Sequence, residues 1–486
     1  MVRQRIKLTL HTIGSLLKYF ALAYIIPLGA ALYCHYREND PREENWWIYL
    51  IFLVSTLAIG LLLQFGFKTD EEIERADGFT IVAFTWLLIP LFGTLPYVFL
   101  GLGFTDAFFE AMSGFTTTGA TILNAAGTGG FFALPKSALL WRSLTQWLGG
   151  MGVIVLFVAI LPRLTVGGSQ LFDREFPGPL PERLRPRFRT TARLLWTIYV
   201  AFTAAQIALL YFLARLPLFD SICISFSTLS TGGFTPTTAG IGAYANPLAE
   251  YIIMVFMFLG GMSFIIHYQV LRGNWKAIKD DEFRLYLVIL LVATVLLIFA
   301  QGLNSYREGM FQAISIMTTT GFVTADFSSW HSSAKIVLLA LMFIGACGGS
   351  TGGGIKVMRA LTLMKHARVM MRRAISPKAV IPLKYNQKPL SEEIIRDIVS
   401  FLFLYILVAV VASIVLCFLG LNLETAVSAV AATLGNVGPG LGGVGPASNY
   451  AWLPGAVKAI LIICMWFGRL ELFTALMIFS RRFWKG

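Results

Sequence analysis

The sequence repeats one short glycine-containing stretch four times, as Thr117-Thr118-Gly119-Ala120, Ser230-Thr231-Gly232-Gly233, Thr319-Thr320-Gly321-Phe322 and Asn436-Val437-Gly438-Pro439. Before each copy stands a short apolar stretch with an acidic residue near its start, which is Asp106, Asp220, Glu308 or Glu424. After each copy comes a second glycine signature inside an apolar run, such as Leu148-Gly149-Gly150-Met151. Two landmarks that recur in the same order indicate one structural unit repeated along the chain.

The composition is that of an integral membrane protein. Hydrophobic residues make up 56% of the 486 residues and charged residues only 13%, and the mean hydropathy is +0.71. Several apolar runs exceed the roughly 18 residues that mark a candidate membrane span. The net charge of +13 gathers in loops that we expect to stay in the cytoplasm, so it does not indicate nucleic-acid binding.

The apolar runs predict an all-α membrane protein with ten spans and both termini in the cytoplasm. This arrangement puts every basic segment, including 163–190 and 359–388, on one side of the membrane. Each repeat is expected to be a span, a pore half-helix, a filter and a second span around one pore. The predicted units are a two-span extension at 1–78 and pore repeats at 79–165, 191–274, 284–371 and 393–486.

The stretches 105–116, 219–229, 306–317 and 424–434 are too short to cross a bilayer, so we expect re-entrant half-helices. In the first, Thr105 or Asp106 is expected to be the N-cap, and the four acidic residues are expected to cap helices rather than bind ions. The second spans are expected near 138–162, 249–273, 334–358 and 454–480. Only the third of these is expected to be interrupted.

Irregular backbone at membrane depth is tolerated where it is buried in protein or lines a water-filled cavity. Four glycine segments around one axis can present a ring of carbonyls that replaces the hydration shell of a cation. None of the four contains Asp, Glu, Lys or Arg, which disfavours a divalent-cation site and an anion pore. Carbonyls and Thr hydroxyls suit a monovalent cation. Potassium fits best, and sodium is the competing ion.

Two further features interrupt the apolar runs. The glycine-rich stretch 348–354 should unwind its span, because each glycine costs a helix about 1 kcal/mol relative to alanine. The unwound stretch could be a gate for ions or a purely structural kink. It is not a phosphate-binding loop, because its glycines and Lys356 lack the spacing of that motif. Arg469 lies within the last span, where a charge is costly and therefore a functional candidate. We predict that it lies beneath the filter and binds carbonyls of the unwound stretch, the alternative being a pair with Glu471.

The four repeats, the stretch 348–354 with Lys356, and Gly468-Arg469-Leu470-Glu471 together resemble the superfamily of Trk, Ktr and HKT potassium transporters, and most closely its bacterial TrkH/TrkG branch. The resemblance implies potassium uptake across the bacterial inner membrane through a carbonyl-lined filter, with an intramembrane gating loop at 345–356. The implied potassium-binding residues are Thr117, Thr118, Gly119, Ser230, Thr231, Gly232, Thr319, Thr320, Gly321, Asn436, Val437 and Gly438. The implied gate residues are Gly348, Gly349, Gly352, Gly353, Gly354, Lys356 and Arg469.

The resemblance also implies a homodimer in the lipid membrane and a cytosolic nucleotide-binding partner of the TrkA type. Potassium is then the transported ligand, with no covalently bound cofactor and no enzymatic activity. Neither a channel nor a proton- or sodium-coupled symporter is excluded. Two alternatives stay open, which are a sodium-preferring member of the same superfamily and a secondary transporter with broken helices that carries a small solute.

Overall fold

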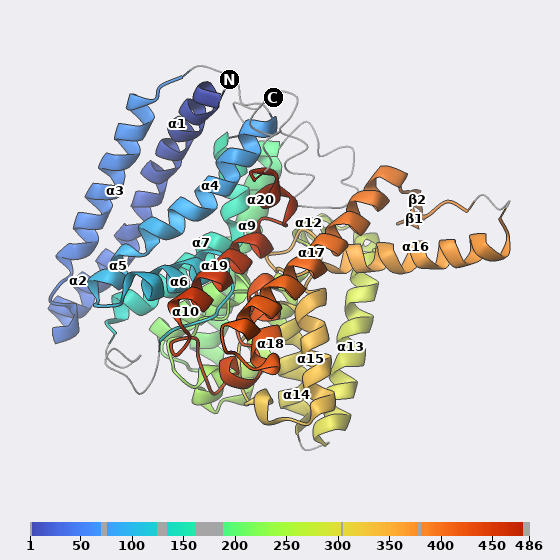
Figure 1. The fold of residues 1–486 in the computed structure, drawn as a ribbon. Helices are drawn as coiled ribbons and strands as arrows, with labels where there is room; N and C mark the ends of the chain where they lie inside the picture. Colours follow the sequence, from blue (N-terminus) through green and yellow to red (C-terminus); the bar gives the residue numbers. More distant parts are fainter. Residues whose placement is uncertain are drawn as a thin grey trace.

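The structure is a computed structural model that describes residues 2–69, 75–123, 134–160, 188–302, 305–377 and 381–479. Most of the segment 163–190, which we predicted to be cytoplasmic, lies outside these residues. Within them the elements are helices, apart from one antiparallel hairpin in which β1 (Lys384–Tyr385) pairs with β2 (Lys388–Pro389). The predicted all-α class is therefore confirmed, with four repeated units and an N-terminal extension (Figure 1).

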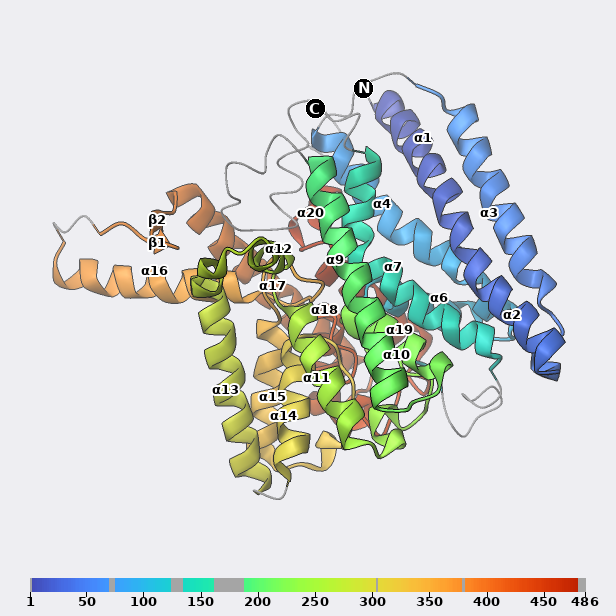
Figure 2. The same ribbon diagram turned by 180° about the vertical axis from the view of Figure 1, so that it is seen from behind.

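The N-terminal extension is a helical hairpin at one side of the molecule (Figures 1 and 2). It consists of α1 (Val2–Ala21), α2 (Ile25–Arg37) and α3 (Trp47–Gly66). Gly14 and Gly60 let α1 and α3 approach closely, since a methyl group on Gly14 would come within 2.7 Å of the Gly60 carbonyl oxygen. Small residues at such crossings are how membrane helices gain van der Waals contact.

Each repeat runs from a long first helix through a half-helix to a second helix. Repeat one has α4 (Arg75–Gly93), α5 (Leu95–Phe99), α6 (Phe104–Phe115) and α7 (Lys136–Ile160). Repeat two has α9 (Phe188–Ala208), a π-helical turn (Leu209–Leu213), α10 (Leu218–Leu229), α11 (Pro247–Gly261) and α12 (Phe264–Leu271). Repeat three has α13 (Asp281–Gln301), α14 (Tyr306–Met317), α15 (Ser332–Ile344) and α16 (Val357–Ile375). Repeat four has α17 (Glu392–Phe418), α18 (Leu423–Leu434), α19 (Gly455–Arg469) and α20 (Phe473–Met477).

The half-helices α6, α10, α14 and α18 are each 12 residues long. At 1.5 Å per residue such a helix reaches about 18 Å, well short of the hydrocarbon core. The prediction for the start of the first was wrong, because α6 begins at Phe104 with Gly103 as its N-cap. The four acidic residues lie in the first turn of their helices and not at the N-cap. In the first turn their negative charges still interact favourably with the helix dipole.

The second helices depart most from the predicted spans. The interruption of the third is confirmed, since α15 ends at Ile344 and α16 begins at Val357. The continuous second spans predicted for repeats two and four were wrong. The chain bends by 99° between α11 and α12, and α19 ends at Arg469, after which Glu471 and Leu472 have positive φ. Both breaks lie where the chain bonds to another repeat, which the local sequence cannot reveal.

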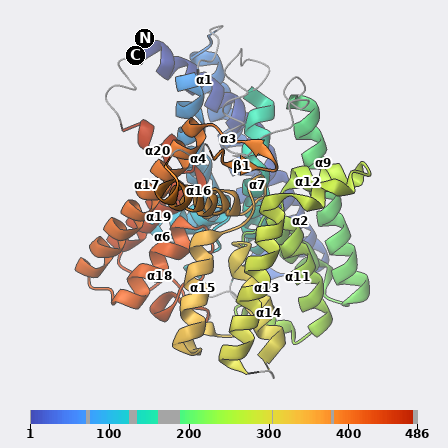
Figure 3. The same ribbon diagram turned by 90° about the vertical axis from the view of Figure 1, so that its right-hand side faces the viewer.

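Six helices of the described chain are long and apolar enough to cross a membrane, or seven if the bent pair α11–α12 counts as one span. The remaining predicted spans involve α7 and the broken pairs α15–α16 and α19–α20, which are not among these candidates. The count of ten therefore stays a prediction. Beyond the break, α16 projects from the bundle, and Figure 3 looks along it.

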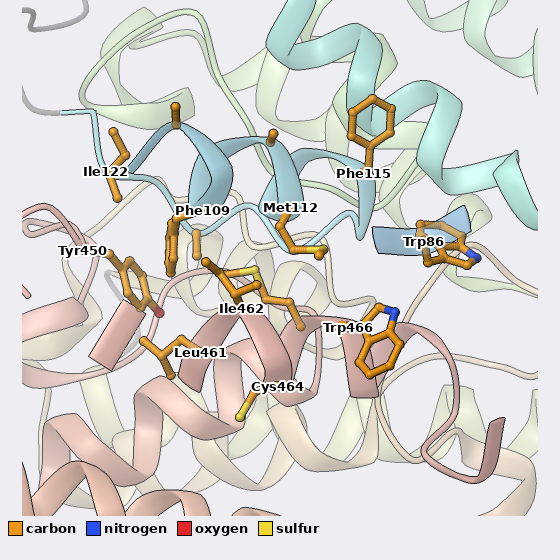
Figure 4. Close-up of a cluster of buried hydrophobic side chains, with 14 of the residues drawn as sticks. Trp86, Phe109, Met112, Phe115, Ile122, Tyr450, Leu461, Ile462, Cys464 and Trp466 are labelled. Atoms are coloured by element: carbon orange, nitrogen blue, oxygen red, sulfur yellow. The ribbon is translucent and has the colours of Figure 1, made fainter. Parts of the chain in front are cut away.

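Two large hydrophobic clusters hold the bundle together. One joins the N-terminal extension mainly to repeats one and four, and the other mainly joins repeats two and three. Figure 4 shows the first cluster where α6 packs against α19, with Phe109 and Met112 facing Leu461 and Ile462. The rings of Phe109 and Tyr450 lie 5.4 Å apart. The last repeat therefore closes on the first, and the half-helices surround one centre.

Candidate functional site

Each half-helix ends in the same turn. The residue after the C-cap is left-handed in all four copies, and the residue after that donates its N–H back to the last turn of the helix, as in a Schellman motif. The left-handed residues are Thr117, Thr231, Thr319 and Asn436. The N–H···O distances are 2.9 Å from Thr118 to Ser113, 2.8 Å from Gly232 to Ser227, 2.9 Å from Thr320 to Ser315 and 2.7 Å from Val437 to Ala432.

This turn is strained in three of the four repeats. Thr117, Thr231 and Thr319 have φ values of 53°, 54° and 59°, a conformation that β-branched residues rarely adopt. Glycine is the usual residue at this position of a Schellman motif. Strain of this kind persists only where the surrounding structure imposes it, and it is concentrated at functional sites.

Two residues further on, a glycine with positive φ closes each segment against the next repeat. These glycines are Gly119, Gly233, Gly321 and Gly438. A methyl group on any of them would collide with a backbone oxygen of the following repeat, which belongs to Gly232, Thr320, Val437 and Thr118 respectively. Since repeat four leads back to repeat one, the four segments form a closed ring. We call these segments the filter segments.

The ring corrects the predicted register of the second copy. By conformation and contact, Gly233 and not Gly232 is equivalent to Gly119. Ser230, which we predicted as a filter residue, is the C-cap of α10 and bonds back to the Phe226 carbonyl at 2.7 Å. Two adjacent glycines left the alignment ambiguous by one residue, and only the helix end decides it.

Side chains behind the ring hold the filter segments in place. The Gln146 amide on α7 donates to the Gly232 carbonyl at 2.6 Å and accepts from Phe234 N at 3.0 Å. The Asn436 amide donates to Thr118 Oγ1 at 3.0 Å and so links the fourth segment to the first. Gln146 was not found from the sequence, because nothing in its neighbourhood marks it as a partner of a later repeat.

The two sides of the ring differ in free space. On one side lies an open cavity of about 440 Å³ whose lining includes all four ring glycines. On the other side lies a cavity of only about 30 Å³, lined by Gly353, Asn436, Gly468 and Arg469 among others. The ring is therefore accessible from one side and covered on the other.

The cover is the segment 345–356, which we call the glycine loop. Its Gly353 N–H donates to Thr319 Oγ1 of the third filter segment at 2.8 Å. Thr351 Oγ1 donates to the Leu229 carbonyl at the end of α10 at 2.9 Å. The Gly349 carbonyl accepts from Phe264 N at 3.0 Å, just after the bend in repeat two. The loop therefore bonds to the ends of two half-helices and to the following helix of repeat two.

The remaining predicted loop residues lie in the same segment. Gly348 N donates to Glu282, Gly352 N donates to Ser350 Oγ at 3.3 Å, and Gly354 has a positive φ and packs against Gly345. Gly352 and Gly354 line the small cavity beneath the ring together with Gly349 and Gly353.

Arg469 donates hydrogen bonds to oxygen atoms of this loop and of repeat one. Its guanidinium donates to the Thr351 carbonyl at 2.9 Å, the Gly149 carbonyl at 2.7 Å and Thr117 Oγ1 at 3.2 Å. The side chain is 9% exposed. It thus contacts the glycine loop and the first filter segment together.

Glu471 pairs with residues at the exit of the loop. Its carboxylate lies 2.9 Å from Lys356 Nζ and also pairs with Arg359. Both basic side chains are 9% exposed. Lys356, the last residue of the glycine loop, is therefore buried against Glu471. The loop is thus fastened at its end by the same helix break that presents Arg469.

Glu282 fastens both ends of the loop and was missed from the sequence. Its Oε1 accepts from Gly348 N at 2.6 Å and from Met358 N at 3.0 Å, and the residue is 5% exposed. A buried carboxylate at a span end is a functional candidate by default. No group of three His, Cys, Asp or Glu residues in the described chain could hold a metal ion.

Comparison with known proteins agrees with this geometry. Residues 48–485 match the TrkH family model, which is described as a cation transport protein. The chain belongs to the TrkH family. Members of this family are membrane transport proteins and not enzymes, so the predicted class and the absence of catalysis are confirmed.

Relatives match over nearly their whole length. The Trk system potassium uptake protein TrkH of Salmonella typhimurium is 38% identical over 97% of this chain and 98% of its own. The Trk system potassium uptake protein TrkG of Escherichia coli is 34% identical over the full length of both chains. The crystal structure of the potassium transporter TrkH from Vibrio parahaemolyticus superposes with a TM-score of 0.83, 34% identity and coverage of 98% and 99%. The TrkH fold is thus shared throughout the chain.

Proposed function

We propose that this chain takes up potassium through the ring of filter segments, across a bacterial inner membrane. The observation that carries the proposal is the closed ring itself, in which four equivalent glycines each pack against a carbonyl of the next repeat. Carbonyls held in a ring can replace the water shell of a cation. The names of the similar Trk uptake proteins support potassium as that cation.

The proposed ion ligands are backbone oxygens of the filter segments, with the second copy shifted by one residue from the sequence prediction. The residues are Thr117, Thr118, Gly119, Thr231, Gly232, Gly233, Thr319, Thr320, Gly321, Asn436, Val437 and Gly438. The half-helices point their negative C-terminal ends at this ring, which favours a cation there. Because each filter segment contributes one ring glycine, we expect a single well-matched ion site and a moderate preference for potassium over sodium.

The glycine loop is proposed to be the gate. The small cavity beneath the ring and the bonds from the loop to two half-helices support a closed state. Arg469 is proposed to hold this state and to limit ion occupancy below the filter. In the open state the loop would leave Thr319 and Leu229, and the cavity would join the cytoplasm.

The topology and assembly are proposed on the same resemblance. Ten spans with cytoplasmic termini fit the six candidate spans plus one second helix in each repeat, of which those in repeats two, three and four are bent or broken. The repeat boundaries proposed from the sequence follow this count. A homodimer in lipid and a cytosolic TrkA-type nucleotide-binding partner complete the proposal, and chemical cross-linking in membranes tests both.

The deciding experiment is uptake of radiolabelled rubidium into liposomes that hold the purified protein, with potassium or sodium as competitor. Inhibition by potassium at much lower concentration than by sodium is the expected result. Equal competition would favour the sodium-accepting alternative. No rubidium flux, even with the glycine loop deleted, would overturn the proposal in favour of a solute transporter with broken helices.

A further inference from the structure

A buried ion pair lies behind the ring at the joint between repeats one and two. Glu110 on α6 and Arg142 on α7 approach to 2.8 Å, with side chains 0% and 2% exposed. The Arg142 guanidinium also lies 4.1 Å from the centre of the Phe234 ring. Neither charged residue is part of a filter segment or of the glycine loop.

The ion pair forms hydrogen bonds with the residues that follow two of the filter segments. Glu110 accepts from Ile122 N at 3.0 Å and from Thr121 Oγ1 at 3.0 Å, just after Gly119. Arg142 donates to the Thr235 carbonyl at 3.1 Å, just after Gly233. The chain segments that follow the ring glycines of the two neighbouring repeats are therefore both hydrogen-bonded to one ion pair. Such charge-assisted bonds are stronger and more directional than neutral ones.

The other repeats do without this pair. The residues at the position of Glu110, counted back from the half-helix C-cap, are Ile224, Gln312 and Ala429. The residues at the position of Arg142, counted back from the second glycine signature, are Ile253, Leu338 and Leu461. All six are buried with 0% exposure. The fold therefore accommodates neutral side chains at these positions.

A buried ion pair is weak evidence for stability, because apolar residues of similar volume usually serve as well. Its geometric constraint is the better-supported role here. A ring that cannot contract leaves a smaller ion too far from the carbonyls to replace its water shell, which is one source of potassium over sodium selectivity. A joint tied by charge resists such contraction at the Gly119–Gly232 contact.

We propose that Glu110 and Arg142 are positioning residues that set the potassium-over-sodium selectivity of the ring. They would do so by fixing the distance between the chain segments that follow Gly119 and Gly233. This inference rests on the proposed function, since it presumes that ions pass the ring. It assigns selectivity to a pair outside the filter segments and to one joint of the four.

The test is the ratio of sodium to potassium concentrations that halve rubidium uptake, measured for wild type and for Glu110→Ile with Arg142→Ile. This double variant copies the isoleucines of repeat two and leaves no unpaired buried charge. The expected result is a ratio lowered by about tenfold with rubidium uptake retained. A ratio within about twofold of wild type would overturn the inference. The ratio does not depend on how much protein folds.

The matched control is Lys335→Leu with Glu424→Leu, which removes an ion pair between repeats three and four whose side chains are 25% and 47% exposed. Its ratio should match wild type, and an equal fall there would overturn the inference. If the double isoleucine variant is not recovered folded, Glu110→Gln is read in its place by the same criterion. A wild type that does not prefer potassium would instead contradict the proposed function, and the inference with it.

Discussion

The guanidinium of Arg469 lies 2.9 Å from the carbonyl oxygen of Thr351, so the last repeat holds the interrupted helix of the third. The same side chain reaches Gly149 O and Thr117 Oγ1 in the first repeat. One residue therefore connects the glycine loop, the first filter segment and the break in its own helix. A loop tied in this way can move only if these bonds are exchanged for others.

Arg469→Ala should raise the maximal rate of rubidium uptake, because the loop loses its charged anchor and the region beneath the ring loses a positive charge. The expected rise is about tenfold, the scale of one lost hydrogen bond to a charged group. Uptake into liposomes measures it. Arg469→Lys keeps the charge but loses the forked pair of donors. Its rate of rubidium uptake should therefore lie between those of wild type and Arg469→Ala. Unchanged rates and potassium affinity in the alanine variant would exclude the proposed role.

Deletion of residues 349–353 should also raise rubidium flux, since it removes the cover from one side of the ring. The size of the rise should at least equal that of Arg469→Ala, because the deletion removes the anchored segment itself. Thr351→Val is the matched control, as it keeps the loop length and loses only the hydroxyl bonds to Leu229 and Gly260. It should give a smaller rise. Folded deletion protein with unchanged or lower flux would show that the loop is not the barrier.

Alanine substitution tests the register of the second filter segment. Gly233→Ala should abolish potassium-selective uptake, because the new methyl group meets the Thr320 backbone oxygen and the φ of 82° is unfavourable for alanine. The three atoms nearest to the new methyl group of Gly232→Ala all belong to the Gln146 side chain. Adding Gln146→Ala should therefore restore uptake at least partly to Gly232→Ala and not to Gly233→Ala. The opposite pattern of rescue would return the register to the one expected from the sequence.

Glu282→Ala should loosen both ends of the glycine loop, because Gly348 N and Met358 N lose their shared acceptor. A buried N–H without a partner costs about 1–3 kcal/mol. Hydrogen exchange in residues 345–358 should speed up markedly, and basal rubidium flux should rise. Glu282→Gln keeps one acceptor oxygen and should show a smaller effect on both. If exchange in this segment stays slow in the alanine variant, the carboxylate does not anchor the loop.

The four-repeat architecture could be predicted because each repeat carries its own local signals. Glycine at the filter, an apolar stretch too short to span, and a glycine-rich break at 348–354 are all properties of nearby residues. Arg469 was found for the same reason, since a charge in an apolar run is visible without a structure. Its predicted contact with the unwound loop is present in the structure.

What could not be predicted depends on contacts between repeats. The bend after Gly261 coincides with the Phe264–Gly349 bond, and the end of α19 coincides with the pairing of Glu471 to Lys356 and Arg359. Gln146 was missed because its partners are Gly232 and Phe234 of the next repeat. The choice between Gly232 and Gly233 required the end of α10 to be known. Local sequence contains no record of these distant partners.

The closed ring of four glycine–carbonyl contacts has a consequence for how such a protein can change. In an assembly of identical subunits, one codon alters every joint of the ring at once. Here each contact between repeats is encoded separately, so a substitution changes one of the four contacts and leaves the other three unchanged. A single chain can thus accumulate unequal changes around its ion path, and the buried ion pair behind Gly119 is one such difference already in place.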